Sequence, residues 1–187
     1  SKRSQIRFRG GQARCGDDEL RALHASDQLV STPQANIDGG LALSVDLAGG
    51  KDGLIGYRAK RHTALIDIDN PAGYRIAEFW DPIQADEGRS LILDPDQFYI
   101  LASKEAVHVP PGFAAEMIPF NPLVGEFRVH YAGFFDPGFG HSASGGQGSR
   151  AVLEVRSHDV PFILEDGQVI GRLVYEPLTE PPEQVYG

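Results

Sequence analysis

Residues 131–157 read YAGFFDPGFGHSASGGQGSRAVLEVRS, and this stretch carries the pattern that decides the fold. Its first apolar run, residues 131–135, ends in Asp-Pro-Gly. That tripeptide is typical of a tight turn, because Pro fixes φ at the first central position and Gly accepts a positive φ at the second. A bridge rich in Gly and Ser follows, and residues 151–155 form a second apolar run with one acid, Glu154, inside it. The stretch therefore predicts two β-strands connected by a turn and a loop.

The rest of the chain repeats this pattern of short apolar runs separated by turn residues. Its 22 Gly and 13 Pro residues punctuate runs that are rich in Val, Ile, Leu, Phe and Tyr. Strands are expected at residues 41–47, 65–68, 76–80, 90–93, 98–102, 114–119, 127–135, 151–156 and 169–176. One helix is expected, since residues 17–19 supply an acidic first turn and Leu20, Leu23 and His24 then recur at helical spacing. The sequence predicts a mainly β domain, a jelly roll or sandwich, with one short N-terminal helix.

Composition narrows the class of protein and of partner. The 187 residues suffice for one domain with a core, and no apolar run reaches the ~20 residues that cross a bilayer, so no membrane partner is expected. A net charge of −9 disfavours a nucleic-acid polymer as partner, although it permits a small nucleotide ligand. The single cysteine, Cys15, excludes an internal disulfide and a Cys-rich zinc site; it indicates an incidental loop thiol and a reducing, cytoplasmic location.

Several catalytic motifs are missing from the sequence. The six histidines form no zinc-binding pattern with a Cys pair, so a zinc deaminase is disfavoured and no metal ligand is predicted. The Gly-rich segments, residues 138–140 and 145–148, precede a strand pattern and not a helix, which disfavours a phosphate-binding loop of the P-loop type. No serine lies on a strand-to-helix elbow, and a serine hydrolase is therefore disfavoured as well.

Two acids remain as candidates, and each has an ordinary explanation beside the functional one. On a strand, Glu154 shares a face with Arg150, Val152 and Arg156, so it could lie on a solvated surface between two arginines. It could instead face a partly dry cleft and move protons to and from a water molecule. Asp136 could serve only the turn, or it could hold a sugar hydroxyl. The pattern alone leaves both pairs of alternatives open.

The two ends of the chain look different from its middle. Residues 4–9 alternate like a strand and look like residues 171–176, as though the chain began with the last strand of a preceding copy. We therefore expect residues 1–12 to be a strand or linker from a preceding domain and residues 13–187 to be the β domain. Residues 180–187 are Pro-rich and polar, which is typical of an extended arm.

Three motifs in this order resemble a known family. The runs AGFFDPGFG (132–140), AVLEV (151–155) and GQVIGRLVYEPL (167–178) resemble the zinc-independent dCTP deaminases of the dUTPase-like superfamily. The upstream runs DELRALHASDQLV, IDGGLALSVDL and DQFYILASKEAVHVPPGFAAEM extend the likeness over most of the chain. The chain is thus similar to the C-terminal domain of the long, two-domain form of that deaminase, and a dUTPase-like distorted jelly roll is implied.

The resemblance also implies a site and a reaction, the hydrolysis of dCTP to dUTP and ammonia in pyrimidine deoxynucleotide synthesis. Glu154 matches the catalytic acid that deprotonates the attacking water and then protonates the departing amine. The implied substrate-binding residues are Asp136 at the deoxyribose 3′-hydroxyl, Tyr131 and Ala132 at the base, Arg128 near the phosphates and Tyr186 beside the sugar. The family binds its triphosphate with Mg²⁺, without zinc, and forms trimers with sites between subunits.

The chain departs from the family at groups that contact phosphate. Residues 120–128 lack the family's Ser and Arg in register, which leaves Arg128 as a displaced substitute, and Phe134 replaces another Arg. Without these groups the fragment alone is expected to be inactive, unless a preceding domain supplies them. Three hypotheses follow: a deaminase domain, a dUTP pyrophosphatase, or a non-catalytic domain that binds nucleotide or builds the trimer. Glu154 favours the first, because cleaving a phosphoanhydride needs no base beside the pyrimidine ring.

Overall fold

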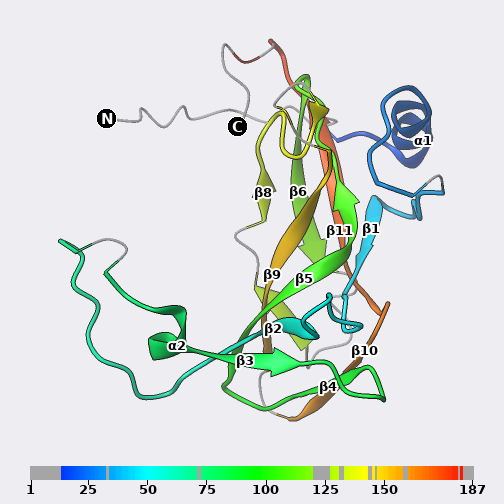
Figure 1. Ribbon diagram of the computed structural model, residues 1–187. Coiled ribbons are helices and arrows are strands. Elements are labelled where there is room, and N and C mark those ends of the chain that lie inside the picture. The colour runs from blue at the N-terminus through cyan, green and yellow to red at the C-terminus, as the bar shows by residue number, and fades with distance from the viewer. Residues whose placement is uncertain are drawn as a thin grey trace.

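A computed structural model describes residues 14–32, 34–70, 73–119, 127–130, 133–142, 145, 147–157, 160–180 and 182. Within these residues the chain forms two helices and eleven strands (Figure 1). They are α1 (Asp17–Ser26), β1 (Leu41–Ser44), β2 (Leu54–Ala59), α2 (Ile76–Phe79), β3 (Trp80–Gln84), β4 (Ser90–Leu93), β5 (Phe98–Val107), β6 (Phe113–Pro119), β7 (Phe127–His130), β8 (Phe134–Phe135), β9 (Ser149–Ser157), β10 (Phe162–Glu165) and β11 (Val169–Pro177). The expectation of a mainly β jelly-roll domain is confirmed; the preceding-domain strand expected at residues 1–12 lies outside the described residues.

The strands form two larger antiparallel sheets and one small one. The first sheet has the order β3-β2-β5-β9-β7, the second has the order β1-β11-β6-β8, and β10 pairs with β4. Burial alternates along the two central strands of the first sheet, where Tyr99, Leu101, Leu153 and Val155 are at most 2% exposed. These side chains share one hydrophobic core with residues of the second sheet such as Leu173. Period-two alternation therefore places one face of the first sheet on the core and leaves the other face outside.

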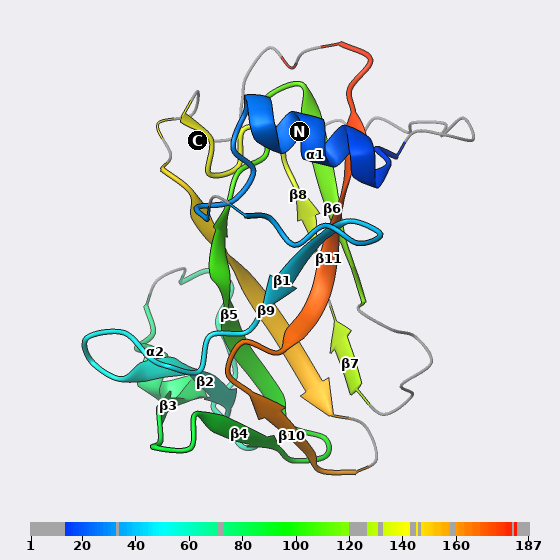
Figure 2. The same ribbon diagram turned by 90° about the vertical axis from the view of Figure 1, so that its right-hand side faces the viewer.

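The predicted N-terminal helix is present as α1, with its acidic first turn at residues 17–19. It crosses one end of the second sheet (Figure 2). The Glu19 carboxylate accepts a hydrogen bond from the backbone N–H of Gly16 at 2.8 Å and caps the first turn. Leu20 is fully buried in the core. Neither α1 nor α2 has the length and apolar character that a membrane-spanning helix requires, and the described residues contain no other helix.

The single strand predicted at residues 127–135 is instead divided between β7 in the first sheet and β8 in the second. Two further predicted strands are wrong, and both lie in the segment between β2 and β3. Residues 65–68 pair with nothing in the described part of the chain and lie on an arm that extends away from the sheets (Figure 1), with Leu65 94% and Ile68 86% exposed. Residues 76–79 form the four-residue helix α2 and Trp80 begins β3, so a second helix joins the one that was expected. Apolar residues alone did not make a strand there, because an isolated segment has no neighbour to pair its backbone groups.

Strand β2 was not predicted. Its Gly56 weakens the strand pattern in the sequence and also explains how close β2 lies to β5. A Cβ atom at Gly56 would lie 2.3 Å from the Ile100 carbonyl oxygen and 2.7 Å from a methyl group of Leu101. Only glycine lets β2 approach β5 this closely. Strand β3 contains Pro82 and was also missed; it lies at the edge of the sheet, where a strand can lack one N–H donor.

A bulge in β5 fixes β9 beside it. The pairing of the two strands shifts between Ala102 and Ala106, and Ser103 is fully buried inside the shift. The Ser103 hydroxyl donates to the Glu105 carbonyl at 2.7 Å and accepts the Ala151 N–H at 2.8 Å. The hydroxyl thus satisfies two backbone groups that the bulge would otherwise leave unpaired.

Candidate functional site

Glu154 lies in β9, which is enclosed by hydrogen-bonded strands on both sides. Its Cα pairs with Ile100 of β5 and with His130 of β7. Its side chain points away from the core that receives Leu153 and Val155, and it is half-buried on the outer face of the sheet. The predicted division of β9 into a core face and an outer face is confirmed. A carboxylate on such a strand is held more rigidly than one on a loop.

On this outer face Glu154 has one apolar neighbour, Val152, and one charged neighbour, Arg156, along its own strand. Val152, two residues away on the same face, is 67% exposed. Arg156 places its guanidinium 5.5 Å from the centroid of the Phe98 ring, and Phe98 in turn packs at 5.9 Å against Trp80. None of the described residues donates a hydrogen bond to the Glu154 carboxylate. Arg156 is therefore engaged with an aromatic ring, and the carboxylate is left available for another partner.

Asp136 follows β8 in the second sheet and begins the predicted turn. The Phe139 N–H donates to the Asp136 carbonyl at 3.0 Å, and Gly138 adopts φ +91°. The turn that Asp-Pro-Gly predicts is thus confirmed. Two further backbone hydrogen bonds fix it, from Gly138 N–H to the Val109 carbonyl at 2.9 Å and from Val109 N–H to the Phe139 carbonyl at 2.8 Å. The Asp136 carboxylate itself is exposed.

An ion pair fixes the loop beyond this turn to helix α1. The His141 Nε2 atom lies 3.0 Å from a carboxylate oxygen of Asp27, just after α1 ends. His108 lies nearby, and its burial, together with the neighbouring His141, lowers the pKa of its imidazole. Of the histidines that formed no motif in the sequence, His141 thus connects the loop after Asp136 to the end of α1.

The predicted site residues fall into three groups. Glu154 and Asp136 are described, and they lie on different sheets. The backbone of Arg128 lies in β7, paired with Arg156 in β9, while its side chain lies outside the described part of the chain. Tyr131, Ala132 and Tyr186 lie outside the described residues altogether. The chain nevertheless leaves β7 at His130, opposite Glu154, and enters β8 at Phe134.

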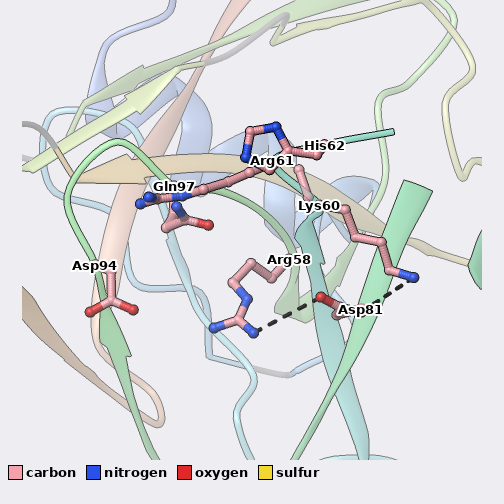
Figure 3. A pocket seen from close by; sticks show the side chains of 8 residues that line it. Arg58, Lys60, Arg61, His62, Asp81, Asp94 and Gln97 are labelled. Atoms are coloured by element: carbon pink, nitrogen blue, oxygen red, sulfur yellow. Dashed lines mark ion pairs between the residues drawn. The ribbon is translucent and has the colours of Figure 1, made fainter. Parts of the chain in front are cut away.

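A hollow that was not predicted lies between β2, β3 and the turn before β5. Its volume is about 500 Å³. Figure 3 shows the side chains that line it. It is lined by Arg58, Ala59, Lys60, Arg61, His62, Asp81, Asp94 and Gln97. The run Arg-Ala-Lys-Arg-His at residues 58–62 was the available signal, because it concentrates positive charge on a chain whose net charge is −9. A second hollow near Val30 and Glu105 also excludes both Glu154 and Asp136.

Among the described residues, no three His, Cys, Asp or Glu side chains converge as metal ligands would. Cys15 is partly buried beside α1, and desolvation, followed by the nearby Glu19 and Glu176, raises the pKa of its thiol. A raised pKa disfavours the reactive thiolate, which agrees with the interpretation of Cys15 as an incidental thiol.

Comparison with known proteins gives one consistent result. Residues 16–187 match the family described as "2'-deoxycytidine 5'-triphosphate deaminase (DCD), C-terminal domain". A crystal structure of 2'-deoxycytidine 5'-triphosphate deaminase from Agrobacterium tumefaciens is 62% identical and superposes with a TM-score of 0.85 over 92% of this chain. This chain covers 50% of the Agrobacterium chain.

Curated relatives are more distant in sequence. A dCTP deaminase of Natronomonas pharaonis is 30% identical over 77% of this chain and 69% of its own length. A protein of Methanobrevibacter smithii named "dCTP deaminase, dUMP-forming" is 31% identical over 60% of this chain. The match spans only 55% of the Methanobrevibacter protein.

Proposed function

The chain belongs to the family of dCTP deaminase C-terminal domains, and from this premise we propose that it deaminates dCTP hydrolytically with Glu154 as the general acid and base. The observation that carries the proposal is the state of the Glu154 carboxylate. It is held in a strand that is hydrogen-bonded on both sides, it lies between Val152 and Arg156 on the outer face, and no described residue donates a hydrogen bond to it. Such a carboxylate can take a proton from water without first losing a structural partner.

The reaction requires one residue to act twice. Glu154 accepts a proton from the water that attacks C4 of the cytosine ring, and the ring carries the resulting hydroxyl and amino groups on one tetrahedral carbon. The same carboxyl group then gives that proton to the amine, the C–N bond breaks and ammonia leaves. One dCTP and one water thus give one dUTP and one ammonia. A rigid strand suits this chemistry, because the acid must stay aligned through both transfers.

Substrate binding is proposed to involve the turn and the neighbouring segment. Asp136 accepts a hydrogen bond from the 3′-hydroxyl of the deoxyribose, and Tyr131 and Ala132 contact the base through their backbone. Arg128 and Tyr186 lie toward the phosphates and the sugar. The triphosphate carries Mg²⁺, which neutralises part of its charge, and no zinc is required.

We further propose that the site is completed between subunits of a trimer. Glu154 lies on an outer sheet face where Val152 is 67% exposed, and neither of the two hollows described above is lined by Glu154 or Asp136. A neighbouring subunit, or another domain of a longer protein, would cover this face and exclude bulk water from the carboxylate. It would also supply the cationic groups that residues 120–128 lack.

Two candidate reactions differ in their nucleotide product, which is dUTP in one and dUMP in the other. The Methanobrevibacter relative is named dUMP-forming, whereas the Natronomonas relative is named dCTP deaminase alone. The first name favours a second candidate in which a further water cleaves the α–β phosphoanhydride, so that dCTP gives dUMP, pyrophosphate and ammonia. Both candidates use Glu154 at the base.

One experiment separates these candidates. The full-length protein is incubated with dCTP and Mg²⁺, and ammonia, dUTP, dUMP and pyrophosphate are measured together. We expect ammonia and dUTP, and we expect Glu154→Gln to abolish both while thermal stability and oligomeric state stay unchanged. Glu165→Gln, on the exposed side of β10, is the matched control and should retain activity.

The remaining outcomes identify the alternatives. Ammonia with dUMP and pyrophosphate would establish the bifunctional reaction. Pyrophosphate from dUTP without ammonia from dCTP would indicate a dUTP pyrophosphatase. Nucleotide binding without turnover would indicate a non-catalytic domain, and full deamination by the Glu154→Gln variant would refute the proposed role of Glu154.

A further inference from the structure

The hollow beside β2 concentrates cationic side chains at one place on an acidic protein. Three of its residues, Arg58, Lys60 and Arg61, carry positive charge, and two, Asp81 and Asp94, carry negative charge, so the hollow is net +1 with His62 neutral. The chain as a whole carries −9. A local excess of positive charge in a concave surface attracts small anions.

The Asp81 carboxylate pairs only weakly with two of these cations. The Arg58 Nη2 atom lies 4.0 Å and the Lys60 Nζ atom lies 3.6 Å from the carboxylate of Asp81, both beyond hydrogen-bond distance (Figure 3). Lys60 also donates to the Ala77 carbonyl at 2.5 Å. The Arg58 guanidinium makes no hydrogen bond to any described residue. The Asp81 carboxylate is thus shared by two cations. Most N–H groups of Arg58 and Lys60 have no hydrogen-bond acceptor among the described residues.

The third cation is positioned by a buried amide. Gln97 is 8% exposed, and with its oxygen turned toward Arg61 it accepts hydrogen bonds from the Nε and Nη2 atoms of that guanidinium. Arg61 therefore reaches across the hollow toward Gln97, as Figure 3 shows, and its Nη1 atom remains available for a ligand. A guanidinium that is already oriented loses little conformational entropy when it binds an anion.

The floor of the hollow is rigid as well. The Tyr99 hydroxyl, buried beneath it, accepts the backbone N–H of Asp94 at 2.9 Å and so fixes the turn that presents this acid. Burial raises the pKa of Tyr99, while Arg58 and Arg61 both act electrostatically on it in the opposite direction.

We propose that this hollow binds a small phosphate monoester, with Arg58, Arg61 and Lys60 holding the phosphate and Asp94 accepting a hydrogen bond from a hydroxyl of the same molecule. A phosphate group offers three terminal oxygens to donors from several directions, and arginine pairs with it bidentately. A volume of about 500 Å³ suits a ligand of the size of a sugar phosphate. The site shares no residue with Glu154 or Asp136, so it stands whether or not the chain deaminates dCTP.

The experiment measures the binding of inorganic phosphate and of ribose 5-phosphate at low salt by calorimetry. We expect both to bind, with ribose 5-phosphate the tighter. Arg58→Gln and Arg61→Gln should each raise Kd about tenfold or more, because each removes a charge-assisted contact. The control Arg21→Gln, which makes the same charge change on α1, should leave Kd unchanged. Asp94→Asn should remove the preference for ribose 5-phosphate over phosphate.

Amide resonances locate the bound anion independently of affinity. Phosphate should shift the resonances of residues 58–62 and 94–97. The proposal is overturned if phosphate does not bind, if both arginine variants bind it like the parent, or if the shifts fall elsewhere. Equal affinity for phosphate and ribose 5-phosphate would overturn the assignment to a monoester. Circular dichroism on each variant establishes that it is folded, which is expected because both arginine side chains lie at the surface.

Discussion

The buried hydroxyl of Ser103 is the point at which the pairing of β5 with β9 can be tested most directly. Replacing Ser103 with Ala removes one hydrogen-bond donor and one acceptor from the interior of the bulge. The Ala151 N–H loses its partner inside the core, where Ala151 is fully buried, and this costs about 1–3 kcal/mol. The Glu105 carbonyl is only half-buried, so water can replace its lost bond at a cost of roughly 1 kcal/mol.

The two losses together predict a decrease of about 2–4 kcal/mol in the free energy of unfolding. With a urea m value of about 2 kcal/mol/M, the midpoint of the transition should fall by roughly 1–2 M. Urea unfolding followed by circular dichroism, at one fixed protein concentration, measures this shift. Ser31→Ala, at an exposed position, is the control and should change stability by less than about 0.5 kcal/mol.

Hydrogen exchange identifies the cause of the loss. The amide proton of Ala151 should exchange faster in the Ser103→Ala variant, while amides in β11 change only through the global loss of stability. A midpoint within error of the parent's would refute the reasoning, because it would mean that the bulge satisfies its backbone groups without the hydroxyl.

Two further predictions rest on single contacts. Gly56→Ala should destabilise the fold by about 1–3 kcal/mol, because its Cβ would collide with the Ile100 carbonyl; an unchanged thermal midpoint would show that β2 can move away from β5 without cost. Hydrogen bonds from the backbone N–H of Gly39 and then that of Gly40 hold the pKa of the Asp17 carboxyl below its ordinary value. The ionised carboxylate therefore stabilises the fold above about pH 4, and this stabilisation is lost as the pH falls further. In the Asp17→Asn variant, the free energy of unfolding from urea titrations should therefore decrease less between about pH 4 and lower pH than in the parent. An equal decrease in both proteins would contradict this.

The parts of the fold that the sequence predicted are those encoded by local patterns. The alternation of residues 151–155 placed Leu153 in the core and Glu154 outside it, and Asp-Pro-Gly specified the turn at Asp136. Helix α1 was predictable because its acidic first turn and its buried Leu20 lie within one short segment. In each case the residues that determine the structure are near neighbours in the chain.

The parts that were missed depend on contacts between distant segments. Residues 65–68 look like a strand, but no other strand lies beside them, so their composition could not make them one. Strand β2 contains Gly56, which weakens its pattern and which only the closeness of β5 explains. The hollow combines residues 58–62 with Asp81, Asp94 and Gln97, which meet only when β2 pairs with both β3 and β5. Such pairings cannot be derived from the periodicity of one segment.

The placement of Glu154 and Asp136 on separate sheets makes the core a spacer between them. The thickness of the layer formed by Leu101, Leu153 and Leu173 sets how far apart the two sheets stand, about 10 Å in packed β-sheets. Adding a methyl group to that layer, or removing one, should change the separation of the sheets and so the position of one acid relative to the other. If Glu154 and Asp136 bind one nucleotide as proposed, mutations deep in the interior should therefore change nucleotide binding without contacting either acid.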